Sequence, residues 1–438
     1  MSVQIAIALI DLVVVTVLII RRVDVRLVLL AAAVPLFANS GGLKQMLTKL
    51  VEEMANPGTV VPICTALGFA YVLRITECDQ HLVRLLLRPL RHVRWLLIPG
   101  GISAGYLVNT TIVSQTGTAA VLGPILIPLL RAGGVQPATA GAILLLGSSM
   151  GGELFNPGAV EMRKLAELTG LSGPEVVARS TAQNLLACGT ALLSFWALSQ
   201  FRGGRKPVPG ALGAEAETEP AGGSVDFAIN PIKALVPVLP LVLLFTDSSL
   251  GALSPLRALE GPAKILAAML IGIILAGLTS PRVGGQLATA FFEGAGYAYA
   301  HVISLIVAAS TFAEGINRSG LIAVIVRGLV GWPAAALAVS MIAPWALAVV
   351  SGTGIAPAVS IMEFFVPVAA SMHLDPVRLG TVAALGSHFG RTMSPAAAVV
   401  AMSSKLAHVP PSSLTRQVVL PLAIGGATLL VATLLGWL

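Results

Sequence analysis

Two short polar turns that resemble each other interrupt the apolar sequence of this chain. Their residues are Ser114, Gln115, Thr116, Gly117 and Thr118, and Ser351, Gly352, Thr353 and Gly354. If a helix begins directly after each turn, its first N–H groups and its dipole face an anion, and the hydroxyl groups add donors for carboxylate oxygens. The alternative is that these hydroxyl groups only satisfy the backbone of kinked helices. Because the turn occurs twice, we predict an anion-binding site.

A second break follows each turn, where a proline comes after a polar residue. The residues are Asn156, Pro157 and Gly158 in one break, and Arg391, Thr392, Ser394 and Pro395 in the other. Proline removes a backbone hydrogen bond and frees carbonyl groups, which can hold a cation or line a cavity. Arg391 suits a two-pronged hydrogen bond to a carboxylate, and the alternative is a structural ion pair with Glu153 or Glu363. We favour the functional role, in which Arg391 donates to a substrate carboxylate.

Three ionisable residues in or beside apolar segments are candidates to carry a coupling ion. They are Asp11, Glu153 and His388. A charged group inside a membrane is costly and is usually functional, although each of these residues taken singly is more often part of a structural pair. The coupling ion would be Na+ or H+, and we expect no other cofactor. The three cysteines have neither the spacing of a metal site nor that of a disulfide framework.

The composition places these breaks in a membrane. Hydrophobic residues make up 56% of the 438 residues, charged residues only 11%, and the mean hydropathy is +0.89, whereas a soluble domain carries about 25% charged residues. This excludes a soluble enzyme, a nucleic-acid-binding module and a disordered chain, and makes the lipid bilayer the solvent. The 45 glycines and 28 prolines suit broken membrane helices better than continuous rods.

Ten apolar segments predict membrane helices. They lie near residues 4–20, 25–38, 59–75, 95–113, 181–200, 234–248, 263–279, 297–313, 333–350 and 417–438. Residues 114–160 and 351–404 hold shorter apolar stretches, which we interpret as re-entrant hairpins and broken helices. Residues 201–232 are polar and predict a flexible cytoplasmic linker. The predicted organisation is a first membrane repeat at 1–200, this linker, and a second membrane repeat at 233–438.

The two halves repeat short motifs in the same order. The turns at Ser114 and Ser351 are 237 residues apart, and Asn156 and Ser394 are 238 apart, which indicates a duplication. When the first helix runs inward, most Lys and Arg residues fall on the inner side, with Arg163 and Lys164 in an outer loop. The first half then starts outside and the second half inside. We predict an all-α polytopic membrane protein with two inverted-topology repeats, each with about five spanning helices plus a re-entrant hairpin and broken helices.

The motifs of the second half carry a family resemblance. They are Phe312-Ala-Glu-Gly315, Ser351-Gly-Thr-Gly-Ile-Ala-Pro357 and Gly390-Arg-Thr-Met-Ser-Pro395. With these motifs the chain resembles the DcuC-type anaerobic C4-dicarboxylate carriers, part of an ion-transporter superfamily with inverted repeats. The resemblance spans essentially the whole chain outside the linker. Two positions depart from the family pattern, namely Ile355 in place of a polar Asn and Asn156-Pro157-Gly158 in place of a Ser/Thr-rich turn.

The resemblance implies a secondary active transporter and not an enzyme. Its substrates would be succinate, fumarate, malate or aspartate, moved by exchange, efflux or cation-coupled symport with alternating access. It further implies a homodimer in the inner membrane of a bacterium. Carried over residue by residue, it places the substrate among Ser114–Thr118, Asn156–Gly158, Ser351–Gly354 and Arg391–Pro395.

Three other functions remain open from the residues. A Na+/H+ antiporter using Asp11, Glu153 and His388 would not need Arg391, because a fixed cation repels Na+. An intramembrane serine protease would use Ser103 of Gly101-Ile-Ser103-Ala-Gly105 with His301, but that motif needs a strand–turn–helix context and fits small-residue helix packing better. A structural membrane scaffold would carry no solute, and it leaves the two matched pairs of breaks without a role.

Overall fold

The chain folds into a bundle of helices, described here from a computed structural model that covers residues 3–21, 23–40, 42–91, 96–201, 228–250, 254–259, 261–321, 324, 328 and 332–437. Every regular element within these residues is helical, as predicted. The elements before the linker are α1 (Val3–Ile20), α2 (Val25–Ser40), α3 (Leu43–Met54), α4 (Pro57–Ile75), α5 (Cys78–Leu87), η1 (Arg88–Arg91), α6 (Leu97–Thr111), α7 (Gln115–Ala132), α8 (Pro137–Ser149), η3 (Gly152–Phe155), α9 (Val160–Thr169) and α10 (Gly173–Phe201). Those after it are α11 (Pro231–Leu235), α12 (Leu239–Leu250), α13 (Gly261–Thr279), η5 (Pro281–Gln286), α14 (Leu287–Ala298), η6 (Tyr299–Ile303), α15 (Ser304–Arg318), α17 (Pro333–Ser351), α18 (Ile355–Phe365), η7 (Val366–Met372), α19 (Pro376–Met393), α20 (Ala398–Ala407) and α21 (Pro411–Leu434).

Seven helical stretches in the described part of the chain are long and apolar enough to cross a membrane. They are Pro57–Ile75, Pro137–Thr169, Gly261–Thr279, Pro281–Arg318, Pro333–Ser351, Ile355–Met372 and Pro411–Leu434. Three shorter apolar helices lie at Val3–Leu18, Val25–Asn39 and Ala398–Ala407. Because a span needs about 20 apolar residues, the chain is a polytopic membrane protein. Each of the ten predicted apolar segments coincides with one or more of the helices.

Only the ends of the predicted linker lie within the described residues. Most of residues 201–232 lies outside the described residues, which resume at residue 228. The last residues of the predicted linker already belong to α11. Asn230 caps that helix, since its Oδ1 accepts the N–H of Ile232 at 3.0 Å.

The order of elements after the first turn repeats in the second half. In each half a helix ends at a polar turn, a second and a third helix follow, the chain breaks, and a short helix leads into a long one. The matching helices begin 238 to 240 residues apart, at Gln115 and Ile355, Pro137 and Pro376, Val160 and Ala398, and Gly173 and Pro411. The predicted duplication therefore has a direct counterpart in the fold.

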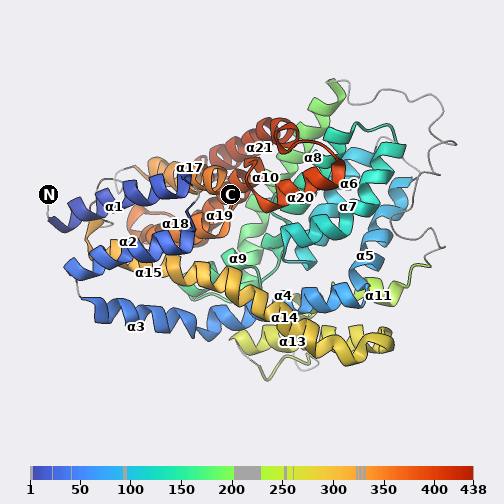
Figure 1. The fold of residues 1–438 in the computed structure, drawn as a ribbon, viewed down its shortest axis with the longest axis horizontal. Helices are drawn as coiled ribbons and strands as arrows, with labels where there is room; N and C mark the ends of the chain where they lie inside the picture. The colour runs from blue at the N-terminus through green and yellow to red at the C-terminus, as the bar shows by residue number, and fades with distance from the viewer. Residues whose placement is uncertain are drawn as a thin grey trace.

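Contacts between the two halves come in matching pairs. Where a helix of the first half packs on a helix of the second half, their two counterparts also pack on each other. α9 packs on α18 while its counterpart α20 packs on α7, and α10 packs on α19 while α21 packs on α8. The counterparts α10 and α21 also pack on each other. Figure 1 shows α6, α7 and α8 toward one end of the molecule and α17 and α18 toward the other, with α10 and α21 between them. Pairing of this kind is the pattern that a twofold relation between two repeats produces.

Glycines hold α17 close to α19 and, in the first repeat, α6 close to α8. A Cβ atom on Gly390 of α19 would lie 2.2 Å from the carbonyl oxygen of Trp345 in α17. In the first repeat, a Cβ on Gly105 of α6 would lie 2.8 Å from Cα of Gly147 in α8. Only glycine fits at such contacts. The Gly101–Gly105 motif therefore lies inside an α-helix and serves helix packing, as the sequence indicated.

Candidate functional site

The first polar turn caps the helix that follows it. Ser114 has an extended backbone and ends the break after α6, and its Oγ accepts the N–H of Gly117 at 3.1 Å. Thr118 is buried, and its hydroxyl group donates to the carbonyl oxygen of Ile112 at 3.3 Å. These two hydroxyl groups satisfy backbone groups of the turn, which leaves Gln115 and Thr116 at its tip.

The second polar turn leaves its helix without a side-chain cap. α17 ends at Ser351, and Gly352 follows with φ of 72°, in the left-handed region that favours glycine. α18 then begins at Ile355, and its N-cap residue Gly354 provides no side-chain hydrogen bond. The first N–H groups of α18 therefore carry the positive end of the helix dipole without a capping side chain.

The two tips meet at one cavity of about 250 Å³. Both turns contribute to its wall, together with the residues of the later breaks. The polar and glycine residues of the wall are Ser114, Gln115, Thr116, Glu153, Glu161, Tyr297, His301, Gly352, Thr353, Gly354 and Arg391. Apolar side chains such as Leu67, Val113 and Val302 complete it. A small cavity with a few convergent polar groups is the usual form of a binding site for a small molecule.

Arg391 is the cation of this cavity. It comes from the end of α19 and is 5% exposed. Its Nη2 lies 3.3 Å from Oε1 of Glu153 and donates to the carbonyl oxygen of Ser149 at 3.2 Å. Its Nε is buried without a hydrogen-bond partner, and its Nη1 packs closely against Gly354, where a Cβ would lie 3.0 Å away. The guanidinium thus lies against the second tip with one N–H group unpaired.

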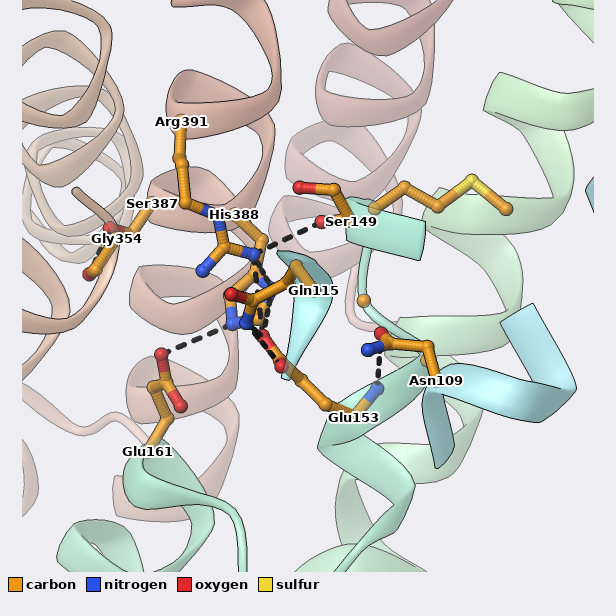
Figure 2. Close-up of polar contacts among 12 residues, drawn as sticks. Asn109, Gln115, Ser149, Glu153, Glu161, Gly354, Ser387, His388 and Arg391 are labelled. Carbon is orange, nitrogen blue, oxygen red and sulfur yellow. Dashed lines mark hydrogen bonds and ion pairs between the residues drawn. The ribbon is translucent and has the colours of Figure 1, made fainter. Parts of the chain in front are cut away.

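His388 lies one turn before Arg391 and joins two carboxylates. Its Nδ1 is 3.2 Å from Oε1 of Glu153, and its Nε2 is 3.2 Å from Oε1 of Glu161. Nδ1 is also 3.0 Å from Nη2 of Arg391. All four side chains are buried. Figure 2 shows them converging between α19 and the broken segment that carries Glu153.

Two other residues of the first repeat hold Glu153 in place. Its backbone N–H donates to Oδ1 of the buried Asn109 at 3.0 Å. Its carboxylate accepts hydrogen bonds from the side-chain amide of Gln115 (Figure 2). Gln115 therefore connects the first tip to the ion cluster, and Arg391 connects the cluster to the second tip.

Several predicted site residues hold the breaks in shape and lie outside the cavity wall given by the described residues. Asn156 donates to the carbonyl oxygen of Thr110 at 3.0 Å, and its Oδ1 accepts the N–H of Gly158 at 2.8 Å. Thr392 bonds the hydroxyl group of Ser149 at 2.8 Å. The others in this group are Gly117, Thr118, Pro157, Ser394 and Pro395. Ser351 also lies outside this wall and lines a neighbouring cavity instead.

Asp11 lies apart from the cluster. It belongs to α1, which packs on α2 and α17, and it is not part of the cavity wall formed by the described residues. Of the three candidates for ion coupling, the structure therefore brings together Glu153 and His388 but not Asp11.

The partner of Arg391 is Glu153, one of the two carboxylates considered from the sequence. The other, Glu363, forms an ion pair with Lys164 and accepts a hydrogen bond from Ser310 at 2.6 Å. Lys164 is 1% exposed and Arg163 is 8% exposed. This corrects the placement of both residues in an outer loop, because they lie on the buried helix α9.

Glu161 is a site residue that the sequence analysis missed. It lies in the first turn of α9, whose sequence VEMRKLAELT contains four charged residues and so looks like a solvated helix. The available signal was its position five residues after Asn156, at the start of the helix that follows the break.

Glu153, Glu161 and His388 could hold a metal ion by geometry alone. Their ligand atoms lie within 4.8 Å of one another. However, the guanidinium of Arg391 contacts two of the three residues at 3.3 Å and 3.0 Å. A fixed positive charge at this distance opposes a cation and favours an anion.

Paired broken helices whose tips meet at a buried polar cavity, in a polytopic helical protein, are the architecture of many membrane transporters. The sequence matches the family model of the C4-dicarboxylate anaerobic carrier, DcuC, over residues 42–437. The chain belongs to this family, which confirms the resemblance seen in its motifs.

Known proteins agree with this assignment. The anaerobic C4-dicarboxylate transporter DcuC of Escherichia coli is 24% identical over 380 residues, which cover 84% of this chain and 78% of that protein. An uncharacterized transporter of Haemophilus influenzae is 28% identical over 274 residues, which cover 60% of this chain and 94% of that protein. The crystal structure of the Alcanivorax borkumensis YdaH transporter, described as having an unusual topology, superposes with a TM-score of 0.59 at 17% identity over 100% of this chain and 99% of that one. This structural similarity shows the fold.

Proposed function

We propose that the chain is a secondary active transporter of C4-dicarboxylates such as succinate, fumarate, malate and aspartate. The observation that carries the proposal is that both polar tips and Arg391 share one cavity. One carboxylate of the substrate would bind the uncapped N–H groups of α18 and the guanidinium of Arg391. The other would bind the hydroxyl and amide groups of the first tip.

The size of the cavity supports a small substrate. Pockets for drug-sized ligands have volumes of about 300–1,000 Å³, and this cavity has about 250 Å³. A linear dianion of four carbon atoms can reach both tips with one charge at each end.

Uptake of a dianion must be coupled to the movement of another ion, whereas efflux need not be. At a potential of −100 mV inside, entry of two negative charges is opposed by about 4.6 kcal/mol. Uptake therefore needs cotransported cations or exchange for another anion, whereas efflux needs neither. We propose alternating access of the site to the two sides of a bacterial inner membrane, in a homodimer whose linker at 201–232 lies in the cytoplasm.

Counterflow in proteoliposomes tests the proposal. Vesicles loaded with unlabelled succinate are diluted into labelled succinate, with fumarate, aspartate, citrate and lactate as competitors. We expect transient accumulation of label that fumarate abolishes and lactate does not. Folded, inserted protein without accumulation would contradict the dicarboxylate assignment.

Variants of Arg391 separate this function from Na+/H+ antiport. Arg391→Ala removes the fixed cation and should abolish counterflow, and Arg391→Lys should retain little of it because an ammonium group lacks the fork geometry. An antiporter that uses the Glu153–His388–Glu161 cluster should keep Na+-driven proton movement after either change. Measuring both activities on the same vesicles decides between the two.

A further inference from the structure

One ring nitrogen of His388 lies between a donor and an acceptor. Nδ1 is 3.0 Å from Nη2 of Arg391 and 3.2 Å from Oε1 of Glu153. On the other side of the ring, Nε2 faces Oε1 of Glu161 at 3.2 Å. His388 is fully buried, so these neighbours determine its hydrogen bonding.

The neutral and the protonated ring use these neighbours differently. In the neutral ring that carries its proton on Nε2, this N–H donates to Glu161, and Nδ1 accepts an N–H from Arg391. In the protonated ring Nδ1 also carries a proton. It can then donate to Glu153, but it can no longer accept from Arg391. A single proton therefore replaces an Arg391–His388 contact by a His388–Glu153 hydrogen bond.

We propose that His388 binds the coupling proton and that this proton releases Arg391 from the His388–Glu153 pair to the substrate carboxylate. The proposal rests on the dicarboxylate function proposed above and makes the transporter a proton symporter. The proton comes from water on the side from which the substrate enters the cavity. It returns to water on the opposite side, after the substrate has left and Arg391 has paired again with Glu153 and His388.

The charge of the cluster agrees with this sequence of events. Glu153, Glu161 and Arg391 together carry one net negative charge when His388 is neutral. This charge opposes binding of an anion at a buried site. Protonation of His388 brings the four side chains to zero net charge, with Arg391 free to face the cavity that it lines.

The groups that contact His388 come from three elements. They are Glu153 from η3, Glu161 from α9 and Arg391 from α19. Three further elements that pack on α19, namely α8, α17 and η7, carry no titratable residue.

The other titratable groups on the elements around α19 have partners elsewhere or are exposed. They are Arg163, Lys164 and Glu167 of α9, Glu363 of α18, Glu175, Arg179 and Cys188 of α10, and Arg416 of α21. The surface loop between α1 and α2 lines the neighbouring cavity with Asp24. This loop adds no carboxyl group that titrates near neutral pH, because the guanidinium of Arg26 lowers the pKa of Asp24 to about 2. Tyr297 and His301 line the same cavity, and their rings stack on each other. His301 is exposed, so it needs its own variant.

The wild-type protein gives the first test. Fumarate counterflow is measured at equal pH on both sides between about pH 6 and pH 8.5, where both carboxyl groups of fumarate stay ionised. We expect the half-saturating fumarate concentration to fall by up to about tenfold for each unit of pH decrease, as one bound proton requires. In separate vesicles that contain no dicarboxylate, a pH-sensitive dye inside the vesicles should record proton entry during net uptake of fumarate. Counterflow without pH dependence or proton entry, or accumulation driven by Na+ alone, overturns the proton proposal and leaves dicarboxylate transport standing. Absence of counterflow overturns both.

Matched variants assign the proton to His388. His388→Asn keeps an acceptor near Arg391 but cannot bind a proton, so counterflow should lose its pH dependence and keep the high half-saturating concentration of the alkaline wild type. The control is His373→Asn, the same change at an exposed residue after η7, which should keep the wild-type profile. Retained pH dependence in His388→Asn, or its loss in His301→Gln alone, overturns the assignment.

A further variant keeps the test valid if His388→Asn does not fold. Glu161→Gln removes the negative partner of Nε2 while leaving the imidazole in place. The pH at which fumarate affinity is half-maximal should then move downward by about one unit or more, because an opposite charge in contact favours the protonated ring. An unchanged midpoint contradicts the proposal, since a purely structural Glu161 would alter the amount of folded protein but not the midpoint.

Discussion

Gly354 sets how closely the second tip approaches Arg391. Its backbone is in the right-handed helical region, so alanine is compatible there, but the added Cβ would lie 3.0 Å from Nη1 of Arg391. Gly354→Ala should displace the guanidinium by a few tenths of an ångström and raise the half-saturating fumarate concentration by about tenfold, since misplacement of about 1 Å can cost a hundredfold. Gly296→Ala in α14, where a Cβ meets nothing within 4 Å, is the matched control. Equal counterflow kinetics of the two variants would contradict the role of Gly354.

Asp79 makes the folded protein sensitive to pH. It is 3% exposed at the start of α5, and burial raises its pKa to about 6. The folded chain then binds a proton that the unfolded chain has already lost, so stability falls as pH rises from about 4 through about 6. Asp79→Asn should therefore melt at a higher temperature in detergent at pH 8, by a free energy of at most about 3 kcal/mol. The two proteins should melt together below about pH 4, and a gain that persists there would point to a cause other than ionisation.

Residue types alone pointed to Arg391, to the two tips and to Glu153 as one of two candidate partners of Arg391, but not to Glu161 or to the burial of Lys164. An arginine within apolar sequence is costly and so attracts attention. Glu161 and Lys164 escaped because α9 has the composition of a solvated helix. Their burial depends on α18 and α19, which are more than 190 residues away in the chain. No local pattern contains that information.

At the scale of elements, the breaks were predictable and the packing was not. Proline, glycine and hydroxyl residues mark the helix ends at Ser114 and Ser351 in the sequence itself. α3, by contrast, was not predicted, because its charged residues interrupt the apolar pattern. The matching contacts of α9 with α18 and of α20 with α7 are tertiary contacts, which a count of apolar residues cannot supply.

The pairing of α17 with α19 depends on Gly390. A Cβ there would lie 2.2 Å from a backbone oxygen of α17, which no side-chain rearrangement can relieve. Gly390→Ala should force the two helices apart, with a loss of stability of about 1–3 kcal/mol. Thermal unfolding in detergent measures this loss, and counterflow should fall because α17 carries the second tip. Gly189→Ala in α10, where a Cβ meets nothing within 4 Å, should match the wild type in both assays. A Gly390→Ala protein that also matched it would show that the two helices can separate at little cost.

Over the whole molecule, the two repeats divide the ion cluster between them. The first repeat contributes both carboxylates, Glu153 and Glu161, and the second contributes His388 and Arg391. The fold is duplicated while the chemistry is not. Every contact in the cluster between side chains of opposite charge therefore crosses the interface between the two repeats. A change in the protonation of these side chains consequently acts directly on the contacts that hold the two repeats together.

The cavity between the tips adjoins a second cavity that reaches exposed residues. This second cavity of about 430 Å³ shares His301 and Thr353 with the first and extends to Asp24 and Arg26, whose side chains are 46% and 41% exposed. The distribution of Lys and Arg predicts that Arg26 lies on the cytoplasmic side, and on that orientation we expect this conformation to admit solutes from the cytoplasm.

Cysteine labelling tests the sidedness of this opening. Thr353→Cys should react with a membrane-impermeant thiol reagent added from the cytoplasmic side, because residue 353 lines both cavities. Fumarate should slow the reaction, since the proposed substrate would cover the second tip. Ser340→Cys, at a fully buried position of α17, should stay unlabelled and measures the background of the three native cysteines. Labelling of Thr353→Cys only from the outer side would reverse either the orientation of the chain or the face to which this cavity opens, and reaction at Arg26→Cys from the same side would decide between the two.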